Sequence, residues 1–221
     1  MQPQQNKIKI TSLILLILTI IWIVVSTISM LQVKPAWKDS DFIRWVSHPD
    51  IFFILNYINA TLLTVVIIFL FSFIFTFLKP KYESIVIVGL VFIPIYGVIN
   101  LLCYSIQISI VPSIAYNSLN NQYTVNIVSQ LIQANSKSLI GFMNGMAYAI
   151  FGIPSIIYGI LLIKELKKYS GIFLFINGIF CFVGIIGCLI GNSILEMGTM
   201  IGGVIFLISL IFMQFEFKYN E

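Results

Sequence analysis

Long runs of apolar residues, separated by short polar stretches, dominate this chain of 221 residues. A helix that crosses a membrane needs about 20 mostly apolar residues, because the hydrocarbon core of a bilayer is about 30 Å thick. The pattern therefore predicts an all-α fold, a polytopic transmembrane helical bundle that forms a single domain over residues 1–221. Its six predicted spanning helices occupy residues 10–31, 51–78, 84–111, 138–163, 169–191 and 193–215.

The first apolar run raises the question of a cleaved signal peptide, since Lys7 and Lys9 precede it. Its apolar stretch is longer than the roughly 7–15 residues of a signal-peptide core, and no small-residue cleavage site of the A-x-A type follows. We expect a retained spanning helix.

Composition and charge support a membrane protein and predict its orientation. Only 9% of the residues are charged, against roughly 25% in soluble domains. The twelve Lys and Arg residues are spread over loops and tails, so no basic face for nucleic acid forms. Eight of them fall in the N-tail, the loops at 79–83 and 164–168 and the C-tail, and four in the other loops. By the positive-inside rule both termini are predicted to be cytoplasmic. The Ile, Asn and Lys bias indicates an AT-rich bacterial genome, and the expected location is the bacterial plasma membrane.

The two longer loops, at residues 34–49 and 112–137, are predicted to lie outside and to contain short interfacial helices. In the first, Asp41, Arg44, Trp45 and His48 fall at i, i+3, i+4 and i+7, which is one helical face. Together with Asp41, Asp50 and Glu196, His48 could bind a metal or move a proton. Because His48 is the single histidine of the sequence, an ion-paired interfacial helix is the favoured interpretation.

Small residues at a spacing of four are typical of close helix packing in membranes, where burial against lipid provides little driving force. Packing between helices of one chain is favoured here, and a homodimer interface remains the alternative. The predicted packing pairs are Gly141 with Gly145, Gly187 with Gly191, and Gly198 with Gly202.

Polar side chains gather in the predicted outer half of the bundle. Spacings of three and four place those of each helix on one face, and buried amides need partners. We therefore predict an outward-facing polar pocket, with simple interhelical hydrogen bonds as the alternative and with Glu196 alternatively reaching water. The predicted pocket residues are Asn56, Asn59, Asn100, Tyr104, Gln107, Asn144, Tyr148, Glu196 and Thr199.

Several function classes lack their motifs. The sequence has no nucleotide-binding loop, no nucleophile elbow and no C-x-x-C pair. The three cysteines all lie in apolar runs, which argues against a disulfide framework and a zinc site. We predict no catalytic residues, no metal and no cofactor, and favour a non-enzymatic protein.

Three stretches carry a resemblance to a known family. They are the aromatic and acidic loop that leads through His48 and Pro49 into the second run, the segment YSIQIS at 104–109, and the segment GIPSIIYGILLIKELKK at 152–168. In these the chain resembles a family of uncharacterised bacterial six-helix integral membrane proteins of about this length. The resemblance implies the fold and carries no activity.

Three functional hypotheses follow. The leading one is a protein that binds or passes a lipid or small molecule through the polar pocket, with membrane lipids as its surroundings. The second is a partner-binding or immunity-type membrane protein without substrate. The third is a membrane enzyme that acts on lipid headgroups through His48 with Asp41 or Glu196.

Overall fold

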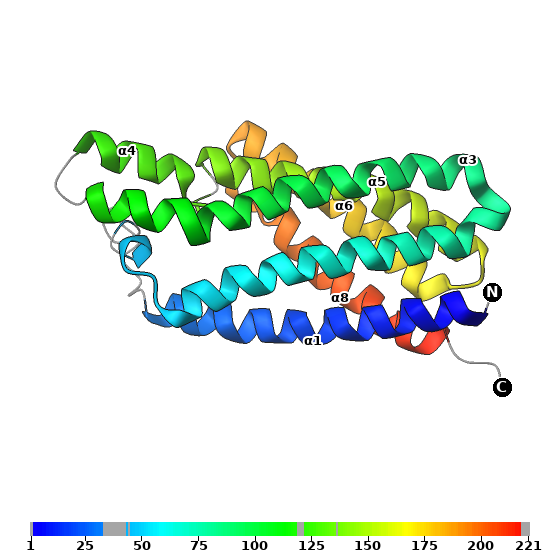
Figure 1. Ribbon diagram of the computed structural model, residues 1–221. Coiled ribbons are helices and arrows are strands. Elements are labelled where there is room, and N and C mark those ends of the chain that lie inside the picture. The colour runs from blue at the N-terminus through cyan, green and yellow to red at the C-terminus, as the bar shows by residue number, and fades with distance from the viewer. Residues whose placement is uncertain (1, 33–42, 44, 119–121, 136, 218–221) are drawn as a thin grey trace. The chain divides into compact units, whose positions relative to one another are not determined.

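The computed structural model describes residues 2–32, 43, 45–118, 122–135 and 137–217. Within these ranges the chain is helical and contains no strand (Figure 1). The helices are α1 (Gln2–Gln32), α3 (Ile51–Ser118), α4 (Gln122–Leu131), α5 (Leu139–Lys164), α6 (Lys168–Ile190), α7 (Ser193–Glu196) and α8 (Gly198–Glu216).

Five helices are long and apolar enough to cross a membrane, as a multi-pass membrane protein requires. The sequence predicts six separate helices, and the difference lies in α3, which joins the predicted helices at 51–78 and 84–111. The five candidate spans are Pro3–Ser29, Ile51–Tyr116, Leu139–Lys164, Lys168–Ile190 and Ser193–Glu216.

The chain forms two compact units, which are described separately. The first unit comprises residues 1–17, 65–98 and 145–221, and the second comprises residues 18–64 and 99–144. Helices α1, α3 and α5 each contribute residues to both units.

Helix α3 is two helices joined at a bend. Its 68 residues would extend about 100 Å if straight, more than three times the thickness of a hydrocarbon core. Tyr82 has non-helical backbone angles, φ −134° and ψ 34°, and Pro80 lacks the amide hydrogen that a continuous helix would use. In the first unit a Cβ on Gly97 would lie 2.5 Å from the Ile68 side chain. The leg after the bend therefore runs back alongside the leg before it.

Helices α5 and α6 of the first unit touch backbone to backbone through glycines spaced by seven. A Cβ on Gly159 would lie 2.6 Å from the Phe175 nitrogen, and one on Gly178 would lie 2.6 Å from the Gly152 oxygen. Side chains larger than hydrogen would force these helices apart, and close backbone approach is the main source of helix association in lipid.

Helices α6 and α8 are joined by hydrogen bonds as well as by glycines. The Asn177 side-chain nitrogen donates to the Gly202 oxygen at 3.0 Å, and the Ser209 hydroxyl donates to the Ser170 oxygen at 2.8 Å. A Cβ on Gly198 would lie 2.7 Å from the Gly184 nitrogen. The two helices form a close antiparallel pair, as the short connection between them requires.

The turn between α5 and α6 is tied to the bend of α3 by Glu165. Its carboxylate accepts hydrogen bonds from Lys81 Nζ at 2.6 Å and from the Tyr82 hydroxyl at 3.0 Å. The hydrogen bond from Lys81, followed by that from Tyr82, lowers the pKa of Glu165 from its ordinary 4.5, against the opposing effect of desolvation. The carboxylate is therefore held in its charged form.

This pairing predicts a pH dependence of stability. A depressed carboxyl pKa stabilises the fold above the unfolded-state value, and the contribution disappears as pH falls through the folded-state value. We expect the free energy of unfolding in detergent micelles to fall by about 1 kcal/mol below pH 4.5, the ordinary value for this carboxyl. The loss should be absent in Glu165→Gln. It should persist in the control Glu83→Gln, which removes only the exposed pair of Glu83 with Lys79 at 3.4 Å. Equal acid sensitivity in wild type and Glu165→Gln would contradict this assignment.

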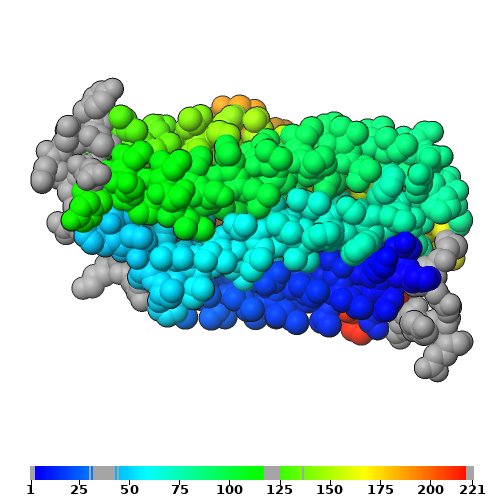
Figure 2. All heavy atoms as spheres, viewed as in Figure 1, coloured from blue at the N-terminus to red at the C-terminus, as the bar shows by residue number. Residues whose placement is uncertain are grey.

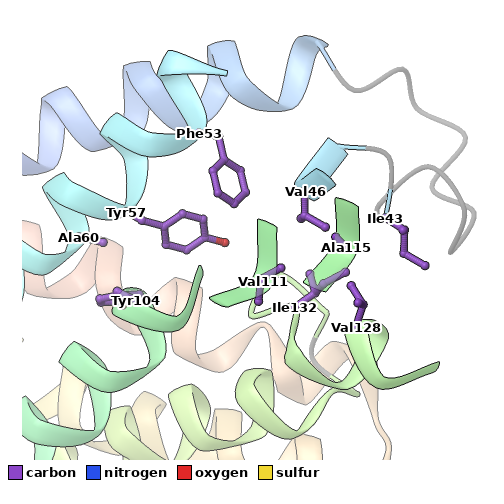
Figure 3. Close-up of a cluster of buried hydrophobic side chains, with 10 residues drawn as sticks. All are labelled: Ile43, Val46, Phe53, Tyr57, Ala60, Tyr104, Val111, Ala115, Val128 and Ile132. Atoms are coloured by element: carbon purple, nitrogen blue, oxygen red, sulfur yellow. The ribbon is translucent and has the colours of Figure 1, made fainter. Parts of the chain in front are cut away.

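The second unit has its own buried apolar cluster, shown in Figure 3. Phe53 and Tyr57 from the first leg of α3 pack edge to face with ring centroids 4.9 Å apart, and Tyr57 meets Tyr104 from the second leg at 6.2 Å. The cluster comprises Ile43, Val46, Phe53, Tyr57, Ala60, Tyr104, Val111, Ala115, Val128 and Ile132. It holds α4 against both legs of α3 and forms the apolar surroundings of the polar residues described next.

Candidate functional site

Asn144 of α5 is the centre of a hydrogen-bond network in the second unit. Its side-chain nitrogen donates to the Asn100 side-chain oxygen at 2.9 Å and to the Tyr104 hydroxyl at 3.3 Å. Its side-chain oxygen accepts from Gln133 Nε2 at 2.9 Å. Asn144 is buried, so one amide side chain joins α5, the second leg of α3 and the loop after α4.

Gln107 positions the end of α4 beside this network. Its Nε2 donates to the Leu131 oxygen at 2.8 Å, and its Oε1 accepts from the Gln133 backbone nitrogen at 3.1 Å. The last carbonyls of a helix lack partners within the helix. Gln107 supplies a partner for one of them through its nitrogen, and its oxygen binds the backbone just after the helix.

Tyr57 and Gln133 belong to the network although sequence analysis did not select them. The Tyr57 hydroxyl donates to Gln133 Oε1 at 3.3 Å. Tyr57 follows Asn56 directly, and its position four residues after Phe53 and three before Ala60 was a usable indication of a buried face. Gln133 lies in a polar loop, where its sequence neighbours do not distinguish it from solvated residues.

The hydrogen bonds of the network run in one direction and end at an amide nitrogen that has no acceptor among the described residues. Donation runs from Tyr57 to Gln133, from Gln133 to Asn144 and from Asn144 to Asn100. Asn100 is fully buried, and its side-chain nitrogen meets no hydrogen-bond acceptor among the described residues. A buried donor left unpaired costs about 1–3 kcal/mol, so the Asn100 nitrogen is an unused donor of the network at a cost in stability.

Asn56 and Asn59, on the first leg of α3, do not hydrogen-bond to Asn144. The Asn56 oxygen accepts from the Ser26 hydroxyl of α1 at 2.6 Å. The Asn59 side-chain oxygen is buried and has no donor within the part of the chain that the structure describes. Asn56 therefore connects α1 to α3, and Asn59 is a second position with unused hydrogen-bonding capacity.

The other three predicted pocket residues belong to the first unit and have contacts of their own there. The Tyr148 ring lies 6.1 Å from the Tyr96 ring. Thr199 packs on Gly184, where a Cβ would lie 2.0 Å from the Thr199 hydroxyl. The Glu196 backbone nitrogen faces Gly187, and its side chain is partly exposed.

The outer-loop cluster is described in part. Asp41 and Arg44 lie outside the described residues. Trp45 packs edge-on against Phe53 with ring centroids 4.9 Å apart. His48 is exposed, its Nδ1 lies 3.0 Å from the Ser47 hydroxyl, and its ring lies 5.7 Å from Tyr116. No group of three or more His, Cys, Asp or Glu side chains placed to hold a metal occurs among the described residues.

The predicted packing glycines have different surroundings. Gly187, Gly198 and Gly202 lie between α6 and the α7–α8 segment. A Cβ on Gly141 would meet the Asn135 oxygen of the preceding loop at 2.1 Å, and one on Gly145 would meet Ile185 at an ordinary 3.8 Å. Gly191 ends α6 with a left-handed φ of 68°, and no described atom lies within 4 Å of its Cβ position. Gly191 therefore lets the chain turn at the end of α6, because the left-handed backbone conformation favours glycine.

Comparison of the chain with models of known families, with curated proteins and with solved structures finds no match.

Proposed function

We propose that the chain crosses a bacterial plasma membrane six times, with α3 crossing twice and both termini cytoplasmic. The length of α3, its bend at Tyr82 and the return of its second leg support two crossings. Lys79 and Lys81 at the bend, and Lys164 and Lys168 at the α5–α6 turn, support a cytoplasmic position for both turns.

We propose further that the protein binds an uncharged polar group of a lipid or small molecule at the network around Asn144, without catalysis. The observation that carries this proposal is the free side-chain nitrogen of Asn100, which is fully buried. A network that served only to join helices would gain from satisfying that donor, since each such bond contributes about 0.6 kcal/mol between membrane helices.

The chemistry of the network favours a neutral ligand. Its described members are amides and phenols, namely Tyr57, Asn100, Tyr104, Gln107, Gln133 and Asn144. A charged ligand group would lack a counter-ion here, and unpaired charge is costly at membrane depth. An ester carbonyl or a hydroxyl oxygen matches the Asn100 side-chain nitrogen, which has no acceptor among the described residues.

Replacing Asn100 tests the proposal with monoolein, a neutral glycerol ester, as the probe. We expect monoolein to raise the unfolding midpoint of the wild type in dodecyl maltoside, and sodium oleate to raise it less. Asn100→Leu should lose the monoolein effect because the donor is gone. Asn56→Leu is the matched control and should keep the effect, since Asn56 is bonded to Ser26 outside the network. At a probe concentration 100 times its Kd the expected stabilisation is about 2.7 kcal/mol.

Two outcomes would contradict the proposal. One is an unchanged wild-type midpoint with both probes, as expected if water alone occupies the position beside Asn100. The other is an equal effect of monoolein on the wild type and on Asn100→Leu, which would place the ligand elsewhere.

A further inference from the structure

Four chain segments meet at one end of the first unit. Lys81 at the α3 bend pairs with Glu165 of the α5–α6 turn at 2.6 Å. Gln214 near the end of α8 donates to the Lys9 oxygen of α1 at 3.1 Å. The N-terminal turns of α1 also lie against the α3 leg, where Lys7 Nζ sits 5.6 Å from the Phe73 ring centre (Figures 1 and 2). The helix ends of this unit therefore form one connected surface.

The carboxylates at this end each have a partner. The described residues include seven lysines here, Lys7, Lys9, Lys79, Lys81, Lys164, Lys167 and Lys168, against three glutamates. Glu83 pairs with Lys79, and Glu165 pairs with Lys81. The Glu216 carboxylate accepts from the backbone nitrogens of Tyr169 and Ser170 at 2.9 Å. These contacts leave most of the seven lysines without a carboxylate partner among the described residues.

Five of these lysines have no carboxylate within 4.0 Å in the described part of the chain. One of them, Lys167, donates to the Glu216 backbone oxygen and lies over the Phe217 ring. The other four are Lys7, Lys9, Lys164 and Lys168. We call these four residues the lysine end. Lys7, Lys164 and Lys168 are exposed, and Lys9 is half-buried. The ammonium groups of the exposed three are free to meet an external anion.

Apolar side chains adjoin the lysine end directly. Ile10 is 51% exposed next to Lys9, Ile160 is 41% exposed one turn before Lys164, and Tyr169 is 52% exposed next to Lys168. A nucleic acid would leave such side chains in water. A lipid leaflet covers them with acyl chains and places its phosphates at the level of the lysines.

We propose that the lysine end binds the phosphate groups of anionic phospholipids. The inference concerns the first unit alone and is independent of the network around Asn144. Exposed lysines next to apolar helix surface extend toward the headgroups, and the four uncompensated charges supply the preference for an anionic over a zwitterionic lipid.

The test compares dioleoylphosphatidylglycerol with dioleoylphosphatidylcholine, each added to the full-length protein in dodecyl maltoside, with the thermal unfolding midpoint as the readout. We expect the anionic lipid to raise the midpoint more than the zwitterionic one. Salt at about 0.5 M should abolish the difference, because it screens the attraction between the lysines and the phosphates. Lys164→Gln and Lys168→Gln should each reduce the difference between the two lipid-induced midpoint shifts by about a quarter, and the double variant should reduce it by about half.

Lys137→Gln is the matched control, because Lys137 is exposed, carries the same charge and belongs to the second unit. Its preference for the anionic lipid should equal that of the wild type. Equal stabilisation by the two lipids would overturn the proposal, and so would an equal loss in Lys137→Gln. Stabilisation by soluble glycerol phosphate as strong as that by the anionic lipid would also overturn it, since the lipid surface would then be dispensable.

Discussion

Replacing Gly159 by alanine is expected to lower the free energy of unfolding by about 1–3 kcal/mol, and replacement by leucine by more. The Cβ of alanine would lie 2.6 Å from the Phe175 nitrogen, 2.8 Å from the Gly171 oxygen and 2.9 Å from the Phe175 Cα. All three are backbone atoms, so no side-chain rotation relieves the overlap and α5 must move away from α6. Reversible unfolding in mixed micelles measures the loss.

Gly203→Ala is the control for Gly159→Ala. Gly203 is exposed on α8, and outside its own helical neighbourhood no described atom lies within 4 Å of its Cβ position. Alanine is the better helix former by about 1 kcal/mol in water, so this variant should be as stable as the wild type or slightly more so. Equal destabilisation at both positions would show that glycine in these helices matters for a reason other than the α5–α6 contact.

Replacing Glu216 by alanine is expected to cost about 2–3 kcal/mol, because it removes the cap of another helix. The Glu216 carboxylate accepts from the Tyr169 nitrogen, the Ser170 nitrogen and the Ser170 hydroxyl, at 2.9, 2.9 and 2.6 Å. The first amides of α6 have no partner within the helix, and a negative charge there also complements the helix dipole. Reversible unfolding should show the loss, and proteolysis should become faster at the α5–α6 turn.

Glu216→Gln and Glu83→Ala separate capping from simple loss of charge. Glutamine keeps one acceptor oxygen and should recover part of the stability. Glu83 forms an exposed i,i+4 pair with Lys79, so its replacement should cost no more than about 0.5 kcal/mol. If Glu83→Ala were as damaging as Glu216→Ala, the effect would arise from net charge and the capping role would be wrong.

The helices themselves were predictable because apolar length is a local property of the chain. Apolar runs at 138–163 and 169–191 predicted helices that the structure places at Leu139–Lys164 and Lys168–Ile190. The same method separated 51–78 from 84–111 at the charged stretch Lys79–Glu83. The structure likewise has one helix on each side of that stretch, and the two meet at a bend at Tyr82, whose backbone angles are non-helical, with no loop between them.

Glycine spacing predicted helix contacts only in part. The predicted spacing of four at Gly198 and Gly202 falls in the α6–α8 pair. The α5–α6 contact instead uses a spacing of seven, Gly152 with Gly159 against Gly171 with Gly178. Spacings of four and seven both recur on one helical face, and only the partner helix determines which of them is used.

The polar network was likewise predictable from the sequence only in part. Asn100, Tyr104, Gln107 and Asn144 were identified from their helical phase, and the structure brings all four together. Gln133 was not identified, because it comes from a loop without periodicity. Tyr57 donates to Gln133, and Gln133 donates to Asn144, which in turn leaves the Asn100 nitrogen without an acceptor among the described residues. Because Gln133 lies in a loop, this order of hydrogen bonds could not be derived from the helices alone.

The sequence by itself determined that this protein consists of apolar helices of membrane-spanning length, and which faces of them carry amides and glycines. These properties follow from hydropathy and helical phase, which operate over a few turns. Only the tertiary structure decided which faces meet: Glu216 with the start of α6, Glu165 with the α3 bend, and Gln133 with Asn144. The physical reason is that apolar helices in lipid gain little from burial as such, so pairing depends on close backbone approach and on a few hydrogen bonds between residues far apart in the chain.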